Sequence, residues 1–387
     1  MTNKKLAVLG IVAAGMLVWA VVQHRVSKIG SPAKITLRDS FLIQGLPTSK
    51  IAGVVIGKGD NPVRLTRQGR DFVVSSKDGY PALTSKINDL ITSLLDIRII
   101  ELITDNPNNH ESLSVTEEKS QNLIKFFDKD EKVITGIIVG TSRFDENLQF
   151  DTRSTYVRLI SDDRVYLAKD VPLSGGSGMD YIDKELVDVR DSDIVKVAVS
   201  TPDRSYTLRI EDPNDTDVIL VDKPADREQK DYDCKQVFRA LMSLTFSDVM
   251  KESSAADLKF DHKYICELKD KRTYTFDIAK KDDKTYVKCS AEYTGEIPRT
   301  VGRDESADEL KVKETKLLAW DQAEKFTQKC SQWVYEVPSW KADNLTKKFA
   351  DLLEEPKKEE DDKEQAQKTD AASSPAVAKK GQEPPKK

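Results

Sequence analysis

The sequence predicts an α+β fold: two tandem copies of a β-hairpin, helix and antiparallel-strand unit behind a single N-terminal transmembrane helix. Three observations carry this prediction: a long apolar run near the N-terminus, an alternating apolar pattern that occurs twice, and an apolar helical stripe after each occurrence. A chain of 387 residues also fits about two domains of roughly 150 residues each, with flanking segments.

The apolar run "LAVLGIVAAGMLVWAVV" extends from Leu6 to Val22 without a charge. It is just long enough to span a bilayer core, and Trp19 lies near one end, where interfacial aromatic residues occur. A cleaved signal peptide is the alternative, but the run exceeds a typical signal core and no small-x-small cleavage box follows it. We therefore expect an uncleaved signal-anchor at residues 6–23. The short N-terminus with Lys4 and Lys5 favours a cytoplasmic N-terminus. A second group of basic residues after the run favours the opposite orientation: Arg25, Lys28, Lys34 and Arg38.

The alternating pattern occurs in "KIAGVVIGKGDNPVRLTRQG" (Lys50 to Gly69) and again in "DIVKVAVSTPDRSYTLRIED" (Asp193 to Asp212). An offset of 143 residues places apolar residues on apolar residues: Ile51 on Ile194, Val54 on Val197, Ile56 on Val199, Val63 on Tyr206 and Leu65 on Leu208. The same offset places Pro81 and Ala82 on Pro224 and Ala225. Alternation around a turn-forming segment is typical of a half-buried hairpin. Each copy is therefore predicted to begin with a hairpin.

A helix is predicted after each hairpin, because apolar residues recur there at spacings of three and four. The two stripes are Ile87, Leu90, Ile91, Leu94 and Ile97, and Cys234, Val237, Phe238, Leu241 and Leu244. Strand-like segments close each copy, and Tyr156-Val157-Arg158 is expected to be equivalent to Tyr286-Val287-Lys288.

The C-terminal segment from Glu354 to Lys387 is rich in charge, Ala, Pro and Gln, with Val377 its one valine and no aromatic residue, so we expect a disordered tail. The predicted organisation is a cytoplasmic N-terminus (1–5), an anchor (6–23), a linker with a first strand (24–49), a first α+β copy (50–188), a second α+β copy (189–353) and a charged tail (354–387).

Four segments of the chain are distinctive: "LVDVRDSDIVKVAV" (Leu186 to Val199), "VDKPAD", "VYL" (Val165 to Leu167) and "WVYEVPSWKADNLTKKFADLL" (Trp333 to Leu353). These segments resemble the bacterial domain-of-unknown-function 4340 family. The resemblance runs from about Ser49 to Leu353, and departs from the family where Phe72 and Val218 to Val221 stand in place of a Trp before each Pro. It implies a single-pass protein of the bacterial inner membrane with its bulk outside the cytoplasm. Relatives are often associated with ABC-type transport systems similar to gliding-motility auxiliary components.

Charge and histidine content exclude several functional classes. The 61 basic and 66 acidic residues are interspersed instead of forming a basic stripe, so nucleic acid is not an expected partner. The three histidines, His24, His110 and His262, have no second histidine at a metal-ligand spacing, and each is interpreted as a flanking, solvent-facing or locally bonded residue.

The four cysteines, Cys234, Cys266, Cys289 and Cys330, all lie in the second copy, at spacings too wide for a zinc site. Cys234 falls on the predicted helical stripe and is interpreted as a core residue. A disulfide among Cys266, Cys289 and Cys330 and four free thiols remain alternatives.

Three further segments have compositions that also occur in binding sites. The acidic "EDPNDTD" (Glu211 to Asp217) and "FFDKDEK" (Phe126 to Lys132) lack the glycine and glutamate of a calcium loop and are interpreted as turns. The glycine-rich "LSGGSGMD" (Leu173 to Asp180) lacks the lysine and hydroxyl of a P-loop and is interpreted as a linker. No catalytic, cofactor-binding or metal-binding residue is predicted.

The sequence therefore predicts a non-enzymatic, membrane-anchored extracytoplasmic module. The family resemblance makes it an accessory or scaffolding component of an ABC-type transport or cell-envelope complex. Its expected partners are membrane protein subunits, by that resemblance, and the lipid bilayer through the N-terminal helix. Two alternatives remain open: an envelope enzyme acting on glycan through acidic residues, and a ligand-binding sensor.

Overall fold

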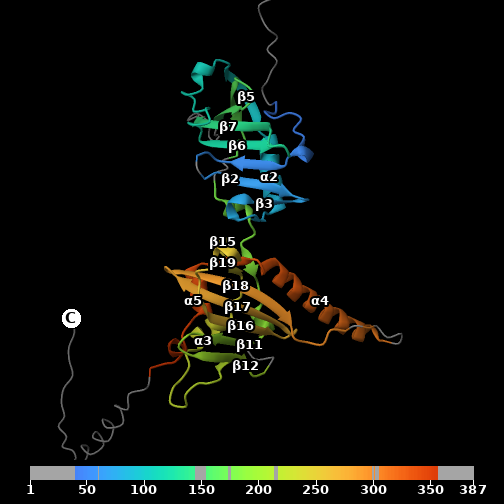
Figure 1. Cartoon of the computed structure of the whole chain (residues 1–387), viewed down its shortest axis with the longest axis vertical. Helices are drawn as coiled ribbons and strands as arrows, with labels where there is room; N and C mark the ends of the chain where they lie inside the picture. The colour runs from blue at the N-terminus through green and yellow to red at the C-terminus, as the bar shows by residue number, and fades with distance from the viewer. Residues whose placement is uncertain are drawn as a thin grey trace, which may run out of the picture. The chain divides into compact units, whose positions relative to one another are not determined.

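The computed structural model describes residues 40–59, 61–143, 154–172, 176–212, 217–298, 300 and 305–355 of the chain. These residues form two compact units, which divide between Lys184 and Glu185 and are called unit 1 and unit 2 (Figure 1). Within the described ranges, helices accompany two large antiparallel sheets, which confirms the predicted α+β class.

The predicted N-terminus and anchor (1–23), most of the predicted linker (24–39) and the tail from residue 356 lie outside the described residues. In the part of the chain that the structure does describe, no helix combines the length and apolar character needed to cross a membrane. The end of the predicted linker joins unit 1, because Leu42 donates its backbone N–H to the Ile97 carbonyl at 2.9 Å and Phe41 forms a β-bridge with Arg98.

Unit 1 is built on a nine-stranded sheet of order β4-β3-β2-β1-β6-β7-β8-β9-β5. The strands are β1 (Gly53–Ile56), β2 (Val63–Gln68), β3 (Asp71–Val74), β4 (Tyr80–Pro81), β5 (Arg98–Thr104), β6 (Asn122–Phe127), β7 (Val133–Arg143), β8 (Ser154–Leu159) and β9 (Val165–Lys169). Helix α2 (Thr84–Leu95) connects β4 to β5. It buries Ile87, Leu90 and Leu94, as the sequence predicts.

Unit 2 is built on an eight-stranded sheet of order β13-β12-β11-β16-β17-β18-β19-β15. The strands are β11 (Ile194–Ser200), β12 (Ser205–Ile210), β13 (Val218–Leu220), β15 (Asp248–Lys251), β16 (Phe260–Leu268), β17 (Arg272–Lys281), β18 (Lys284–Tyr293) and β19 (Trp333–Val337). A separate pair joins β10 (Glu185–Val187) to β14 (Leu244–Thr245). The helices of this unit are α3 (Asp231–Phe238), α4 (Ala307–Cys330) and α5 (Ser339–Leu345).

The two sheets have the same strand order once β4 is set aside, since β1, β2, β3, β6, β7, β8, β9 and β5 occupy the places of β11, β12, β13, β16, β17, β18, β19 and β15. The registers also agree. Val54 faces Leu65 and Ile56 faces Val63 in unit 1, while Val197 faces Leu208 and Val199 faces Tyr206 in unit 2. All eight side chains are buried, so the offset of 143 residues read from the sequence joins positions with the same pairing and burial.

Three details differ from the sequence-based expectation. Helix α2 ends at Leu95, so Ile97, the last residue of the predicted stripe, lies beyond the helix, although it is buried. Helix α3 ends at Phe238, so that Leu241 lies in the following turn and Leu244 in β14, although both are buried. Pro81 belongs to β4, whereas Pro224 lies in a turn beyond β13. In unit 2 the amide of Gln229 instead covers the outer edge of β13, because it accepts from the Leu220 N–H at 2.9 Å and donates to the Val218 carbonyl at 2.7 Å.

Part of the unit 1 sheet is buried on both faces. The segment 105–121 between β5 and β6 covers the second face, where Val115 packs with Leu123, Ile138 and Val165. Gly140 of β7 permits this crossing, since a Cβ atom there would lie 2.3 Å from the Leu113 carbonyl oxygen and 2.7 Å from Val115 Cγ1. This covering segment has one end at the hollow described next.

Candidate functional site

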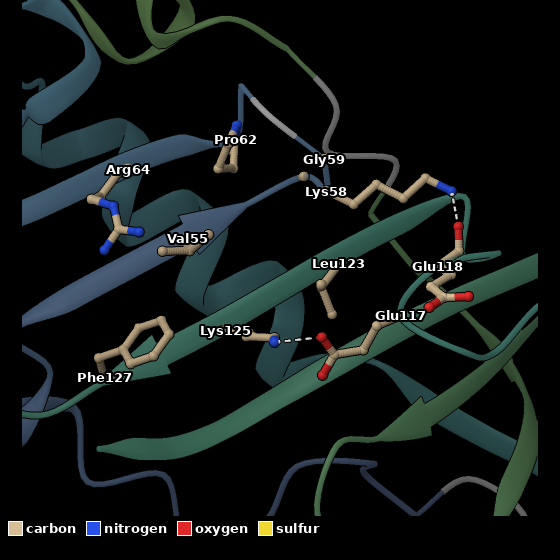
Figure 2. A pocket seen from close by; sticks show the side chains of 11 residues that line it. Val55, Lys58, Gly59, Pro62, Arg64, Glu117, Glu118, Leu123, Lys125 and Phe127 are labelled. Atoms are coloured by element: carbon tan, nitrogen blue, oxygen red, sulfur yellow. Dashed lines mark hydrogen bonds and ion pairs between the residues drawn. The ribbon is translucent and has the colours of Figure 1, made fainter. Parts of the chain in front are cut away.

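A hollow of about 720 Å³ lies on the solvent-facing side of β2, β1 and β6 in unit 1 (Figure 2). Its floor is one row of register partners, because Val55 of β1 faces Arg64 of β2 on one side and Lys125 of β6 on the other. Phe127 and Leu123 lie along β6 beside this row, and Pro62 and Glu117 form the rim. The hollow is open to solvent, and its floor alternates charged and apolar side chains.

Most charges in the hollow are already paired. Lys125 Nζ lies 2.7 Å from Glu117 Oε2, and Lys58 donates from Nζ to the Glu118 carbonyl at 2.9 Å (Figure 2). Arg64, which is exposed, makes no hydrogen bond or ion pair with any residue that the structure describes. The arrangement therefore offers one available guanidinium beside apolar Val55, which suits a carboxylate-bearing or extended ligand better than acid-base chemistry.

The equivalent row in unit 2 carries no charge. Ala198 of β11 faces Thr207 of β12 and Ile265 of β16, which occupy the places of Val55, Arg64 and Lys125. The basic hollow is thus a property of unit 1 and not of the shared sheet.

The glycine-rich segment predicted as a linker ends beside a second hollow of about 550 Å³, next to Ser75 and Ser76. Residues 173–175 of that segment lie outside the described ranges. Ser177 Oγ accepts the Met179 N–H at 3.1 Å, and Asp180 Oδ2 accepts the Ser177 N–H at 2.9 Å. These backbone donors therefore cap a short 3₁₀ turn instead of facing an anion. Gly178 is required by packing, because a Cβ there would lie 2.7 Å from Val74 Cγ1.

Both histidines in the described ranges have a hydrogen-bond partner, which is the adjacent residue for His262, as predicted, but a residue 53 positions away for His110. His110 is buried, and its Nε2 lies 2.8 Å from the Asp163 carbonyl oxygen, which ties the covering segment to the turn after β8. His262 of β16 has Nδ1 at 2.6 Å from Asp261 Oδ1. Among the residues that the structure describes, no three His, Cys, Asp or Glu side chains gather as a metal site would require.

The acidic segment between β6 and β7 is a turn, as predicted. Asp128 Oδ1 accepts the backbone N–H groups of Asp130 and Lys132, both at 2.9 Å, and Glu131 has a φ of 57°. In the second segment, Glu211 and Asp217 pair with Arg209 and Lys235, and residues 213–216 lie outside the described ranges.

The four cysteines are buried, and none is joined in a disulfide. Burial raises the pKa of Cys234 to about 11, and it raises the pKa of Cys266 further. Cys266 faces Tyr274 of β17, whereas Cys289 faces Phe276 of the same strand. The two cysteines are therefore two strands apart, at least about 9 Å between Cα atoms, which exceeds the span of a disulfide. The alternative of a Cys266–Cys289 disulfide is excluded.

Residues 73–263 match the model of the family described as Domain of unknown function (DUF4340). The chain belongs to this family. The matched range begins in β3 and ends in β16, so it includes parts of both units. Neither a curated protein nor a solved structure matches the chain.

Helix α4 is the functional candidate in this DUF4340 chain that sequence reasoning missed. It is inserted between β18 and β19, where unit 1 has only the short turn 160–164 between β8 and β9. Five large apolar side chains on it are between 38% and 55% exposed: Leu310, Val312, Leu317, Leu318 and Trp320. A capping box of Ser306 and Glu309 starts the helix, and this Ser-x-x-Glu pattern was the available signal in the sequence.

Proposed function

We propose that this DUF4340 chain is a non-enzymatic, membrane-anchored extracytoplasmic module, and an accessory or scaffolding component of an ABC-type transport or cell-envelope complex. Its two units are tandem copies of one α+β unit, and an anchor at residues 6–23 holds them at the inner membrane. The anchor and the association with a transport system are inferences from the apolar run and from the family resemblance.

The observation that carries the binding role is the surface of α4. Only its C-terminal half is seated on the sheet, through Ala319, Ala323 and Phe326, whose ring lies edge-on to Tyr274 with centroids 5.0 Å apart. The N-terminal half stands away from the strands of unit 2 (Figure 1).

The exposed residues on α4 include a stripe that turns away from the sheet. At roughly 100° per residue, Leu310 and Leu317 fall on the side of the helix opposite Ala319 and Ala323, and Trp320 lies on the flank, about 60° from Ala323. We call Leu310, Leu317 and Trp320 the outer stripe. Val312 lies on the sheet-facing side and is still 55% exposed, because the helix extends past the strands. A helix with an unused apolar stripe is a common means of docking into a groove on a partner protein.

The test is recovery of partners with the tagged, full-length chain after mild cross-linking of native membranes, followed by mass spectrometry. The wild type is expected to recover an integral membrane subunit and an ATPase. A variant with Leu310→Gln, Leu317→Gln and Trp320→Gln should recover about tenfold less of them or lower still, because the apolar contact is lost. Gln is a good helix former, so the helix itself should persist.

A matched control changes three exposed polar positions of the same helix, Lys311→Gln, Glu314→Gln and Lys316→Gln. This control should recover the partners at the wild-type level. Equal recovery by all three proteins would reject α4 as the binding surface, and recovery of no membrane subunit by the wild type would reject the accessory role.

A further inference from the structure

The C-terminal end of α4 covers a sheet edge that β19 leaves open. β19 pairs with β18 only from Thr285 to Val287, so none of the strands that the structure describes lies beside the outer edge of β18 beyond that point. Thr327 of α4 takes the place of a strand, because its Oγ1 accepts the Ala291 N–H at 2.8 Å and donates to the Ala291 carbonyl at 2.7 Å. This double contact fixes the last turn of α4 against β18.

The same contact brings two cysteines together. Cys289 lies two residues before Ala291 and on the same face of β18, and Cys330 lies one helical turn after Thr327. Each of the two thiols is close enough to shift the pKa of the other, and their residues are 7% and 2% exposed. The Thr327–Ala291 contact therefore holds the segments that carry the two cysteines side by side.

We propose that Cys289 and Cys330 form an oxidation site that closes to a disulfide, with a low-molecular-weight disulfide such as oxidised glutathione as the oxidant. The bond joins α4 to β18 and fixes the base of the helix that carries the outer stripe. Cys234 and Cys266 take no part. The inference does not depend on the proposed function, because purified protein suffices to test it.

The reaction is thiol–disulfide exchange in two steps. One protein thiolate attacks a sulfur of the oxidant, which forms a mixed disulfide and releases one glutathione thiolate. The second protein thiolate then attacks the protein sulfur of the mixed disulfide, which closes the Cys289–Cys330 bond and releases a second glutathione. The two thiol protons pass to the two departing glutathione thiolates, and the two electrons reduce the oxidant.

A lowered pKa favours Cys330 as the attacking thiol. The neighbouring Cys289 thiol lowers the pKa of Cys330, and the Tyr335 hydroxyl and the charge of Lys329 act in the same direction. Burial raises the pKa of Cys289, so Cys289 is the thiol that closes the bond. Since Cys330 is buried, the end of α4 must open for the oxidant to enter, and subdenaturing urea should therefore accelerate oxidation.

The experiment incubates the purified, reduced full-length chain with excess oxidised glutathione, blocks remaining thiols with iodoacetamide under denaturing conditions, and maps unreduced peptides by mass spectrometry. The expected result is one linked peptide pair containing Cys289 and Cys330, with Cys234 and Cys266 alkylated. Reductant should abolish the linked pair and lower the thermal unfolding midpoint of the oxidised chain.

The variants Cys330→Ser and Cys266→Ser serve as a matched pair, each first verified as folded by circular dichroism. Cys330→Ser should lose the linked pair, and Cys266→Ser should retain it at the wild-type yield. Wild-type protein in which all four cysteines remain alkylated, or in which Cys234 or Cys266 is linked, would overturn the proposal, and this readout needs no variant to fold.

Discussion

Units 1 and 2 share one strand order, but the second face of the sheet is covered by a segment of the chain in unit 1 and carries charged residues in unit 2. In unit 1, Leu123 of β6 faces Ile138 of β7, and both are buried under the segment 105–121. At the same register in unit 2, Lys263 of β16 faces Asp277 of β17, and the two form an ion pair at 2.9 Å. The connection there is only the segment 252–259.

The difference shows how one sheet supports two surfaces. The inward-facing residues keep their place in both units, while each unit has its insertion at a different connection. Unit 1 is extended between β5 and β6, and unit 2 between β18 and β19. The outward-facing residues of the sheets are apolar where an inserted segment covers them, and they are charged where they face solvent.

The most severe test exchanges the outward pairs between the units. Leu123→Lys with Ile138→Asp in unit 1 should destabilise the chain by at least about 3 kcal/mol, because two buried apolar side chains are lost and two charges are buried. Lys263→Leu with Asp277→Ile in unit 2 should change stability by about 1 kcal/mol or less, since an exposed ion pair contributes little. Urea unfolding of the full-length chain measures both, and equal effects would break the comparison.

A smaller effect is expected at Gly140, whose register equivalent in unit 2 is Ala279. Gly140→Ala should cost about 1–3 kcal/mol, because the added Cβ meets the Leu113 carbonyl and the covering segment must move. Ala279→Gly is the reverse change and should cost only about 1 kcal/mol, from chain flexibility and a lost methyl contact. Thermal unfolding of both variants would show whether the crossing segment is the cause, and a neutral Gly140→Ala would contradict it.

The smallest effect is expected in the basic row of unit 1. Lys125→Ile gives unit 1 the residue that unit 2 has at Ile265, and removes the ion pair with Glu117. Stability should change by about 1 kcal/mol or less, because the Glu117 side chain is 50% exposed. A loss of several kcal/mol in urea unfolding would mean that the row supports the fold instead of forming a surface; Val133→Ala, at an exposed position of β7, is the reference substitution.

The sequence was sufficient for the features that depend on local period. The alternation at Val54, Ile56 and Leu65 predicted the first hairpin, and the stripe at Ile87, Leu90 and Leu94 predicted α2. The interpretation of Asp128 as a turn residue also agrees with its contacts. The hairpin, the helix and the turn each depend on residues that are close together in the chain, so a sequence pattern can reveal them.

The rest depends on contacts between distant segments. Arg64 and Lys125 are far apart in the chain and meet only because β1 lies between β2 and β6. Cys289 and Cys330 meet because Thr327 is seated on Ala291. One missed signal was readable: "VITGIIVG" in β7 is apolar almost throughout, which is typical of a strand buried on both faces, whereas "RTYTFDIAKK" in β17 alternates.

The place of β1 between β2 and β6 has a practical consequence for recombinant fragments. A fragment cut to the family match, residues 73–263, would lack β1 and β2 and also β17 to β19. It would expose long unpaired strand edges beside bare core residues such as Ile124, a combination that leads to aggregation. A cut between Lys184 and Glu185 leaves every hydrogen-bonded strand neighbour in both large sheets on the same polypeptide.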